Sequence, residues 1–323
     1  MSQIHTLTMP KWGLSMTEGR VDTWLKQEGD AISKGDEVLD VETDKISSSV
    51  EAPFSGILRR QIARQDETLA VGALLGIVVE GERRGIDCSP EAMTRSIDES
   101  LARLKTDRID LFYMHRFDPK VPIEDMVGAL ARAIEAGKIG GYGVSEWSAA
   151  HIREAHAVHP MAAVQTEYSL WTRQPEIAVL ETTRELGIAF VAFSPVARGA
   201  LGGELGDEPQ FGARDIRAGM PRFSSEHWPA NRALIARFEA LATRNGLAPG
   251  QLALAWVLAQ GPHVHAIPGT TSIAHLEENF ATLSLDIPAA VLDEAGALIN
   301  QATVSGPRYS PSMQASIDTE DFA

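Results

Sequence analysis

The chain of 323 residues carries a formal net charge of −15, from 44 acidic and 29 basic residues, and contains one cysteine, Cys88. The acidic balance argues against a nucleic-acid partner and against docking on an anionic membrane, because both attract a basic face. One cysteine excludes an intrachain disulfide and a four-cysteine zinc site, and we expect no metal centre.

The first ten residues lack the basic and apolar segments of a secretory signal. The longest strongly apolar stretch, residues 252–259, is too short to span a bilayer. We therefore expect a cytoplasmic protein. Its sequence pattern changes near residue 82, from short β-like runs to alternating strand-like and helical stretches, so we predict a multidomain chain.

Residues 1–82 have the pattern of an all-β region. Runs that mix β-branched and polar residues, separated by turn-forming residues, occur at 20–25, 37–42, 47–51 and 76–79. A shift of 37 residues brings Gly19 onto Gly56 and Val41 onto Val78. Because turn glycines and apolar positions coincide together, we predict two similar half-sheets that close into one sandwich.

A candidate modification site lies between the two halves, in Val-Glu-Thr-Asp-Lys-Ile-Ser at residues 41–47. Thr43 and Asp44 favour a tight turn between two strand-like runs, so Lys45 is expected at the exposed tip of a hairpin. Most exposed turn lysines are only solvated side chains. This one lies at the pivot of a repeat, which favours a specific role.

Three further segments carry a family resemblance: Met-Pro-Lys-Trp-Gly-Leu-Ser-Met-Thr-Glu-Gly at 9–19, Glu-Thr-Asp-Lys-Ile at 42–46 and Glu-Ala-Pro-Phe-Ser-Gly at 51–56. With them, residues 1–82 resemble a lipoyl domain of the 2-oxoacid dehydrogenase type, most closely that of the acyltransferase subunit of acetoin dehydrogenase. The resemblance implies an all-β lipoyl/biotinyl-type flattened barrel that carries lipoate on Lys45.

Biotin carriers share this fold but usually place methionine on both sides of the lysine, whereas Asp44 and Ile46 flank Lys45 here. The flanking residues therefore favour lipoate. The partners implied are a lipoate-attaching enzyme and subunits of a dehydrogenase complex. The family's peripheral subunit-binding motif and its His-x-x-x-Asp-Gly acyltransferase signature are absent from the sequence.

From Pro90 onward, helical and strand-like stretches alternate, which predicts a parallel sheet with helical crossovers. The helical stretches include 91–104, 123–136, 231–245 and 251–258. The apolar strand-like runs include 109–114, 143–145, 163–165, 188–193 and 265–267.

Seven short segments of this region carry a second family resemblance through their order and spacing: 95–104, 109–116, 143–145, 165–169, 193–195, 267–271 and 276–279. In this order and spacing, residues 83–323 resemble the later part of an aldo/keto reductase, a TIM-barrel family that uses NADP. His115 ends an apolar run, so we expect it at the carboxyl-terminal rim, where barrel active sites lie. A neutral imidazole there can hydrogen-bond a carbonyl oxygen and orient it, so His115 is the candidate catalytic residue.

The resemblance also implies contacts with a nicotinamide nucleotide. Phe193, beside Ser194, matches the aromatic residue that stacks on nicotinamide, and Ser145 and Gln165 match residues that bind its carboxamide. Gly269, Thr270 and Thr271 precede a helical run, whose amides could hold an adenosine phosphate. Glu278 and Asn279 match adenine-side contacts. His275 occupies a position where a phosphate-binding arginine is usual, which leaves the choice between NAD and NADP open.

One departure bears on activity. The family's catalytic tetrad is Asp, Tyr, Lys and His, and its first three members come from strand–helix units that this sequence lacks. Only His115 matches the tetrad. About five of eight barrel strands are present, so we predict an incomplete α/β (TIM-type) barrel that binds NADP weakly and self-associates through its open edges.

Three interpretations of function follow. The chain is a lipoyl carrier with an impaired reductase, or a reductase of small carbonyl substrates completed by a partner chain. The third interpretation is a gene-fusion product with little activity.

Overall fold

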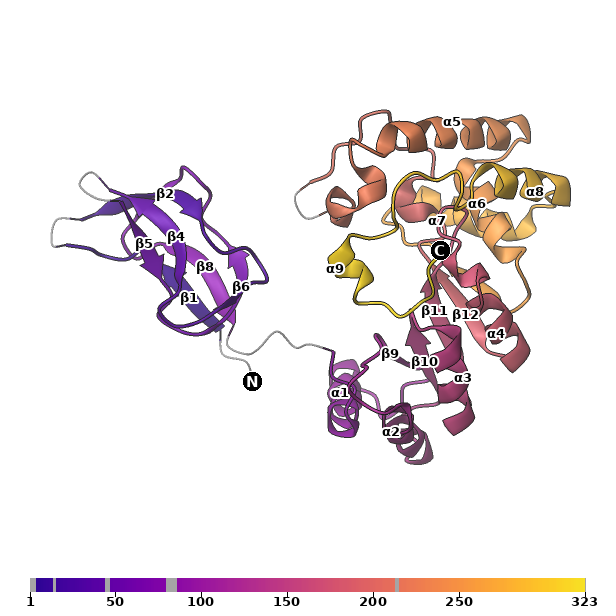
Figure 1. Cartoon of the computed structure of the whole chain (residues 1–323), viewed down its shortest axis with the longest axis horizontal. Helices are drawn as coiled ribbons and strands as arrows, with labels where there is room; N and C mark the ends of the chain where they lie inside the picture. Colours follow the sequence, from indigo (N-terminus) through magenta and orange to yellow (C-terminus); the bar gives the residue numbers. More distant parts are fainter. Residues whose placement is uncertain (1–3, 14–15, 44–46, 80–85, 213–214, 323) are drawn as a thin grey trace. The chain divides into compact units, whose positions relative to one another are not determined.

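The computed structural model describes residues 4–13, 16–43, 47–79, 86–212 and 215–322. The chain forms two compact units, Met1–Ile86 and Asp87–Ala323, whereas the sequence pattern predicted the boundary after residue 82. Each unit has its own buried core. Strands build the described part of the first unit, and strands with helices build the second (Figure 1).

The described residues of the first unit form two four-stranded antiparallel sheets. One has the strand order β1-β8-β6-β3 and the other β5-β4-β2-β7. The strands are β1 Ile4–Thr8, β2 Glu18–Trp24, β3 Ala31–Ile32, β4 Glu37–Glu42, β5 Ser47–Glu51, β6 Gly56–Gln61, β7 Thr68–Ala70 and β8 Leu74–Val79.

The 37-residue repeat reappears as matched strands in the two sheets. Strand β4 begins at Glu37 and β8 begins at Leu74, 37 residues later, and each is the second strand of its sheet. Strands β2 and β6 are the third strands of their sheets. Strands β7 and β3 are the fourth strands of the same two sheets. Each sheet therefore combines strands from both halves of the repeat, so neither half can form its sheet alone.

Gly19 and Gly56 are equivalent in the repeat, and neither has room for a larger side chain. A β-carbon on Gly19 would lie 2.6 Å from Cγ1 of Val41, and one on Gly56 would lie 2.8 Å from Cγ1 of Val78. The second would also lie 2.5 Å from the carbonyl oxygen of Val79. The repeat thus places a glycine against a valine twice.

We predict that Gly56→Ala destabilises the first unit by about 1–3 kcal/mol, because the added methyl group meets a backbone oxygen that cannot rotate away. Gly19→Ala is the matched control and should destabilise less, since the Val41 side chain can change rotamer. Hydrogen exchange of peptides from β6 and β8 in the full chain measures the local opening free energy. Equal protection in the two variants would contradict the prediction.

The second unit contains one parallel sheet with the strand order β13-β12-β11-β10-β9. The strands are β9 Phe112–Met114, β10 Tyr142–Ser145, β11 Ala163–Glu167, β12 Ala189–Phe193 and β13 Val264–Ile267. The helices are α1 Pro90–Leu104, α2 Ile123–Glu135, α3 Ala149–Val158, α4 Val179–Leu186, α5 Trp228–Arg244, α6 Pro249–Leu258, α7 Ile273–Ala281, α8 Ala289–Leu298 and α9 Pro311–Gln314.

Local sequence explains where α1 begins and ends. The Ser89 hydroxyl accepts a hydrogen bond from the amide of Ala92 at 3.3 Å, which caps the first turn, and Pro90 occupies the first helical position. Lys105 ends the helix in a left-handed conformation. The predicted helices at 91–104, 123–136, 231–245 and 251–258 correspond to α1, α2, α5 and α6.

One face of the sheet packs on helices and forms the core of the second unit. Met114, Val144, Val164 and Phe190 come from four successive strands, and all are buried in it. Because side chains alternate along a strand, the neighbours of each of these residues in its own strand point to the opposite face of the sheet. That face carries the predicted site residues.

Both ends of the sheet are open within the described chain. Strands β9 and β13 each pair on one side only. Helix α7, which follows β13, has no fully buried residue, and its Ile273 and Phe280 side chains are 76% and 67% exposed. Of the helices that the structure describes, none combines the length and the apolar character needed to cross a bilayer.

Candidate functional site

The carboxyl ends of four neighbouring strands bring the predicted rim residues onto one face of the sheet. His115 follows β9 directly, and Ser145 and Phe193 are the last residues of β10 and β12. Gln165 lies two residues before the end of β11, in register with Ser145. Alternation along each strand directs all four side chains to the face opposite the helix-packed core.

The surroundings of His115 favour a neutral imidazole. Partial burial and the charge of Arg116 lower the pKa of His115, although Glu146 opposes the shift. The Arg116 guanidinium donates hydrogen bonds to the carbonyl oxygen of His115 at 2.8 Å and to the Ser145 hydroxyl at 3.4 Å. A neutral imidazole retains one N–H, which can donate to a carbonyl oxygen.

Tyrosine is the other residue type that could supply a proton at this rim. All four tyrosines of the chain are described, and each has a raised pKa. Burial is the main cause at Tyr113, Tyr142, Tyr168 and Tyr309, and it raises the pKa of Tyr309 to about 12. Gln165 opposes the shift at Tyr113 through a hydrogen bond. No tyrosine is therefore activated as an acid near neutral pH.

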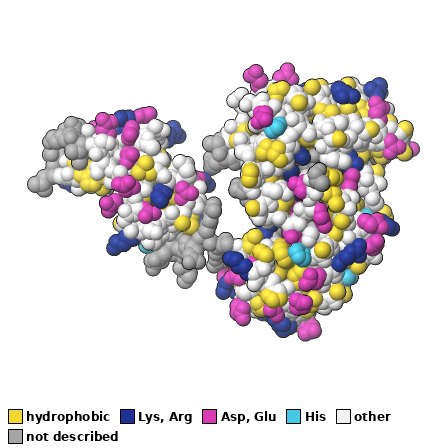
Figure 2. Space-filling view, viewed as in Figure 1, with side chains coloured by type: hydrophobic (Ala, Val, Ile, Leu, Met, Phe, Trp, Pro, Cys, Tyr) yellow, Lys and Arg dark blue, Asp and Glu magenta, His cyan; other side chains and the backbone are white. Residues whose placement is uncertain are grey.

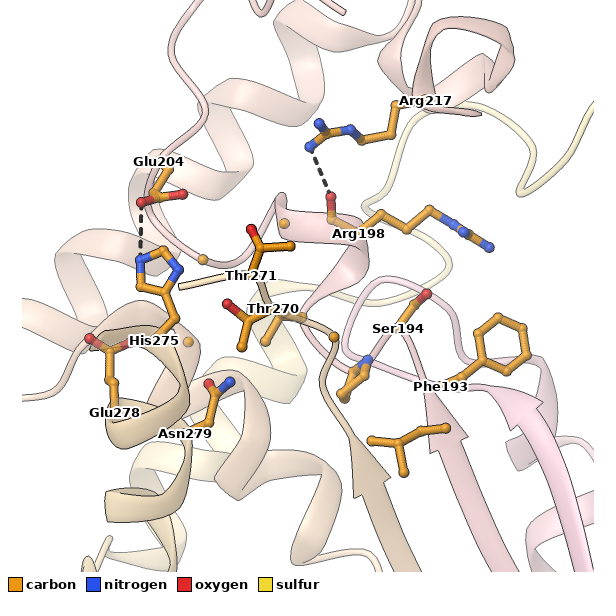
Figure 3. Close-up of a pocket in the computed structure, with 17 residues that line it drawn as sticks. Phe193, Ser194, Arg198, Glu204, Arg217, Thr270, Thr271, His275, Glu278 and Asn279 are labelled. Atoms are coloured by element: carbon orange, nitrogen blue, oxygen red, sulfur yellow. Dashed lines mark hydrogen bonds and ion pairs between the residues drawn. The ribbon is translucent and has the colours of Figure 1, made fainter. Parts of the chain in front are cut away.

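A pocket of about 710 Å³ opens at the carboxyl ends of β12 and β13 (Figure 3). Its size suits a cofactor. Its lining includes eight predicted cofactor residues: Phe193, Ser194, Gly269, Thr270, Thr271, His275, Glu278 and Asn279. His115, Ser145 and Gln165 are not among the lining residues. The structure thus divides the predicted site between this pocket and the rim of β9–β11.

The amino terminus of α7 forms one wall of the pocket. Phe193 and His275 lie on opposite sides of Thr270 and Thr271 in Figure 3. The Thr270 hydroxyl accepts a hydrogen bond from the amide of Ser272 at 3.0 Å, and the Ser272 hydroxyl accepts one from the amide of His275 at 3.4 Å. A helix amino terminus attracts anions, but side chains already occupy two of its amide donors here.

Two family profiles match the chain in succession. The profile described as aldo/keto reductase family matches residues 80–300, and the one described as biotin-requiring enzyme, of the biotin/lipoyl type, matches residues 5–78. The first match covers more than half of the chain. The chain belongs to the aldo/keto reductase family. Its first unit is a biotin/lipoyl domain, a type that carries its cofactor covalently on a lysine arm.

Curated relatives and solved structures agree with this family. The chain is 41% identical over 254 residues to aldo-keto reductase str7 of Strobilurus tenacellus, which covers 78% of this chain and 74% of the relative. It is 43% identical over 225 residues to the NADP(+) aldo-keto reductase yakc of Schizosaccharomyces pombe, with coverage of 69% and 66%. It is 25% identical to the glycerol dehydrogenase structure from Gluconobacter oxydans, with a TM-score of 0.63 over 73% of this chain and 69% of that one.

The candidate lysine of the biotin/lipoyl domain lies outside the described residues. Strand β4 ends at Glu42 and β5 begins at Ser47, and these two residues pair in an antiparallel register. Lys45, with Asp44 and Ile46, belongs to the segment between them that is not described.

A buried charged cluster beside the reductase pocket was not predicted from the sequence. Glu146 follows β10 and Glu167 ends β11, and the Arg308 guanidinium lies between them, with its side chain 2% exposed. Arg308 donates to Glu146 at 2.6 and 2.9 Å and to Glu167 at 3.2 Å. Arg198 and the Tyr309 hydroxyl each donate to Glu167 at 2.7 Å. These five residues are called the tail cluster below.

Two residues of the tail cluster, Glu167 and Arg308, have pKa values shifted toward their charged forms. Burial alone would raise the pKa of Glu167, but the charges of Arg308 and Arg198 lower it overall. Burial disfavours the charged form of Arg308, yet Glu167 and Glu146 raise its pKa. The sequence contains one signal for this cluster, because Glu146 and Glu167 each follow an apolar run. A carboxylate buried at the end of such a run requires a cation beside it.

We predict that Arg308→Met destabilises the carboxyl-terminal segment of this aldo/keto reductase by about 3–5 kcal/mol, because two carboxylates remain buried without their cation. Thermolysin cleavage within residues 300–322, followed in increasing urea, measures the loss. Arg244→Met is the control: Arg244 pairs with Glu294 at the surface, with both side chains more than half exposed, and such pairs contribute about 0–1 kcal/mol.

The same cluster predicts a pH dependence. A carboxylate whose pKa is lowered by folding stabilises the protein above its unfolded pKa, near 4.3 for glutamate, and this contribution is lost as pH falls through the folded value. The wild-type tail should therefore become easier to cleave as pH falls below that range. Arg308→Met should show a flatter profile, and parallel profiles would refute the assignment of Glu167.

Proposed function

We propose that the chain is a lipoyl carrier joined to an aldo/keto reductase unit that binds a nicotinamide nucleotide but has lost most of its carbonyl reduction. The observation that carries the proposal is geometric: His115 follows β9 at the carboxyl ends of the strands, while the described residues between β8 and β9 contain one named element, helix α1. His115 can polarise a carbonyl oxygen. The four tyrosines, the residue type that donates the proton in the family, all have raised pKa values here.

The nucleotide part of the proposal is supported by the composition of the pocket. Phe193 offers an aromatic face at one side. Although side chains accept from two amides at the amino terminus of α7, its helix dipole still favours the negative charge of a pyrophosphate. When bound, the nicotinamide would supply a hydride. The name of the yeast relative includes NADP(+), which supports this class of cofactor for the pocket.

The loss of activity follows from what precedes His115 in the chain. The described residues between β8 and β9 form α1 alone, so the strand–helix units that carry the family's Asp, Tyr and Lys are not found there. Loss of general acid catalysis commonly lowers a rate by about 10² to 10⁴. An incomplete barrel also holds its site loosely, and a displacement of about 1 Å can cost on the order of 10²-fold.

We predict that the purified full chain reduces aldehydes with NADPH or NADH far more slowly than about 1 s⁻¹, a typical lower value for enzymes. Absorbance at the nicotinamide band measures turnover over a panel of aldehydes, with His115→Ala as the comparison. Turnover of ordinary rate that His115→Ala abolishes would show that another residue supplies the proton.

The carrier part of the proposal rests on the biotin/lipoyl domain, and we assign Lys45 as the attachment site and lipoate as the group. Asp44 and Ile46 beside the lysine support lipoate over biotin. The likeness to the acyltransferase subunit of acetoin dehydrogenase supports subunits of such a complex, and a lipoate-attaching enzyme, as partners. Attachment replaces the ammonium charge by an amide.

We predict that intact mass of the chain from its native host shows one lipoyl addition, and that Lys45→Arg abolishes it. Lys34→Arg is the control, since Lys34 lies in a described turn of the same domain. A mass increase that matches biotin would overturn the choice of lipoate. Retention of the adduct in Lys45→Arg would overturn the choice of lysine.

A second candidate function, a reductase completed by association, is favoured by the open end of the sheet at α7. Ile273, Leu276, Phe280 and Leu283 are all exposed apolar residues on or just after this helix. Their spacing follows one side of a helix, as in a surface that packs against another element. Strand β13, which precedes them, has one unpaired edge in the described chain.

We predict that the full chain self-associates at micromolar concentration, because the apolar side of α7 and the open edge of β13 favour contact with a second copy. Phe280→Glu should shift the equilibrium toward monomer in sedimentation velocity. Phe322→Glu is the control, because Phe322 is exposed but lies in the carboxyl-terminal segment. A wild-type chain that stays monomeric at all concentrations would reject this proposal.

A further inference from the structure

A third buried guanidinium, that of Arg222, lies beside the tail cluster. Arg222 belongs to a short helical turn, Pro221–Phe223, and only 8% of the residue is exposed. Its guanidinium donates to the carbonyl oxygens of Gly306 and Trp171, at 3.1 and 2.5 Å, and to the Thr172 hydroxyl at 3.2 Å. All three acceptors are neutral, so none of these contacts balances the charge of Arg222.

The two carboxylates of the tail cluster already pair with the other two guanidiniums. Arg308 forms ion pairs with Glu146 and Glu167, and Arg198 forms one with Glu167. Three guanidiniums therefore share two carboxylates, which leaves one positive charge in excess. A buried charge without a counterion is costly, because water cannot solvate it.

The pKa of Arg222 agrees with this count of charges. Burial lowers the pKa to about 10, and the charge of Arg308 adds to the shift, although Glu167 and Asp321 oppose it. Asp321 is exposed, so water weakens its attraction to the guanidinium. Arg222 remains protonated at neutral pH, where an anion beside it would stabilise the charge.

A small cavity adjoins all three arginines. Its volume is about 10 Å³, and its lining includes Arg198, Arg222, Arg308, Glu167 and apolar residues. A cavity of this size holds about one particle as large as a water molecule. The Nε–H groups of Arg198 and Arg308 are buried, and within the described chain they have no hydrogen-bond partner. Because buried donors are rarely unpaired, the group is short of acceptors as well as of negative charge.

We propose that this cavity binds one chloride ion, and that the ion links three segments of the reductase unit. Arg198 comes from the loop after β12, Arg222 from the turn before α5 and Arg308 from the carboxyl-terminal segment. A monoatomic anion fits the small volume and supplies the missing negative charge. A water molecule would fill the space without balancing the charge, and sulfate or phosphate is too large for it.

The first test is chloride binding to the full chain, measured without turnover. Adding the protein to a dilute chloride solution should broaden the chloride NMR line, because a bound ion tumbles with the protein. Bromide should reverse the broadening by competition, whereas sulfate at the same ionic strength should not. Attraction of chloride to the surface is weak for a chain with a formal charge of −15. Sulfate that reverses the broadening as readily as bromide would overturn the proposed site.

Variants of Arg222 locate the bound ion. Arg222→Met should weaken chloride binding at least about tenfold, whereas Arg222→Lys should retain part of it because lysine keeps the charge. Arg232→Met is the matched control. Arg232 also has buried N–H groups without a hydrogen-bond partner in the described chain, but Glu239 and Asp207 balance its charge. Chloride binding that is unchanged in a folded Arg222→Met chain would reject this cavity as the site.

The wild-type chain gives a second readout that needs no variant. An ion that binds only the folded segment stabilises it by a factor of one plus the ratio of its concentration to its dissociation constant. At a chloride concentration about tenfold above the dissociation constant, hydrogen exchange of residues 300–322 should slow about tenfold relative to gluconate at matched ionic strength. Equal exchange in the two salts, or a chloride line that the protein does not broaden, would overturn the proposal.

Discussion

The buried guanidinium of Arg308 is the constraint on which the reductase unit depends. Glu146 follows β10 and Glu167 ends β11, and their side chains are almost inaccessible to water, 0% and 5% exposed. Removing two carboxylates from water costs more free energy than hydrophobic burial returns unless a cation lies between them. The carboxyl-terminal segment supplies that cation, so it is a structural part of the sheet's rim. The amide of Asp318 donates to the carbonyl oxygen of Glu146 at 2.9 Å and ties the segment there a second time.

The tail cluster also shapes the pocket, because Arg198 belongs to both. Its side chain donates to Glu167, while its carbonyl oxygen accepts a hydrogen bond from Arg217 at 3.2 Å. Ser194 and Arg198 adopt left-handed backbone conformations, with φ of 51° and 56°. Such conformations persist where the surrounding contacts fix them. The cluster therefore fixes the loop after β12. Its Glu167 also neutralises the charge of Arg198, which could otherwise attract a phosphate.

Acidic side chains are spread over the visible face of both units (Figure 2). This agrees with the negative net charge of the sequence. The space-filling view also shows apolar side chains among the charged ones on the second unit. Exposed apolar atoms are common on proteins, so it is the contiguous spacing on α7 that distinguishes that helix.

Patterns with a short period were sufficient to predict much of the architecture. The 37-residue shift anticipated the matching of β4 with β8, and the end of an apolar run anticipated the position of His115 directly after β9. The first follows from an internal repeat and the second from the end of a local apolar run, and a single sequence displays both. The end of β11 was less well anticipated, because the strand continues two residues beyond Gln165.

Contacts between distant segments could not be predicted in this way. Arg308 lies 162 residues from Glu146 and 141 from Glu167 in the chain. No local period relates such positions, and only the packed sheet brings them together. The pairing of His275 with Glu204 is of the same kind, since a loop after β12 meets a helix after β13. Hence the sequence predicted His275 as a cofactor residue but not its contact with Glu204.

The open end of the sheet connects association with nucleotide binding. Helix α7 carries His275, Glu278 and Asn279 toward the pocket, yet it packs on α6 and has no fully buried residue of its own. A helix held from one side opens locally at low free energy. If the proposed association covers the apolar side of α7, it would order the wall of the pocket that α7 forms. Ordering a mobile helix when a ligand binds costs free energy. If a second chain has already ordered α7, a nucleotide would bind with higher affinity although it makes no new contact. By linkage, nucleotide binding would then strengthen association by the same factor.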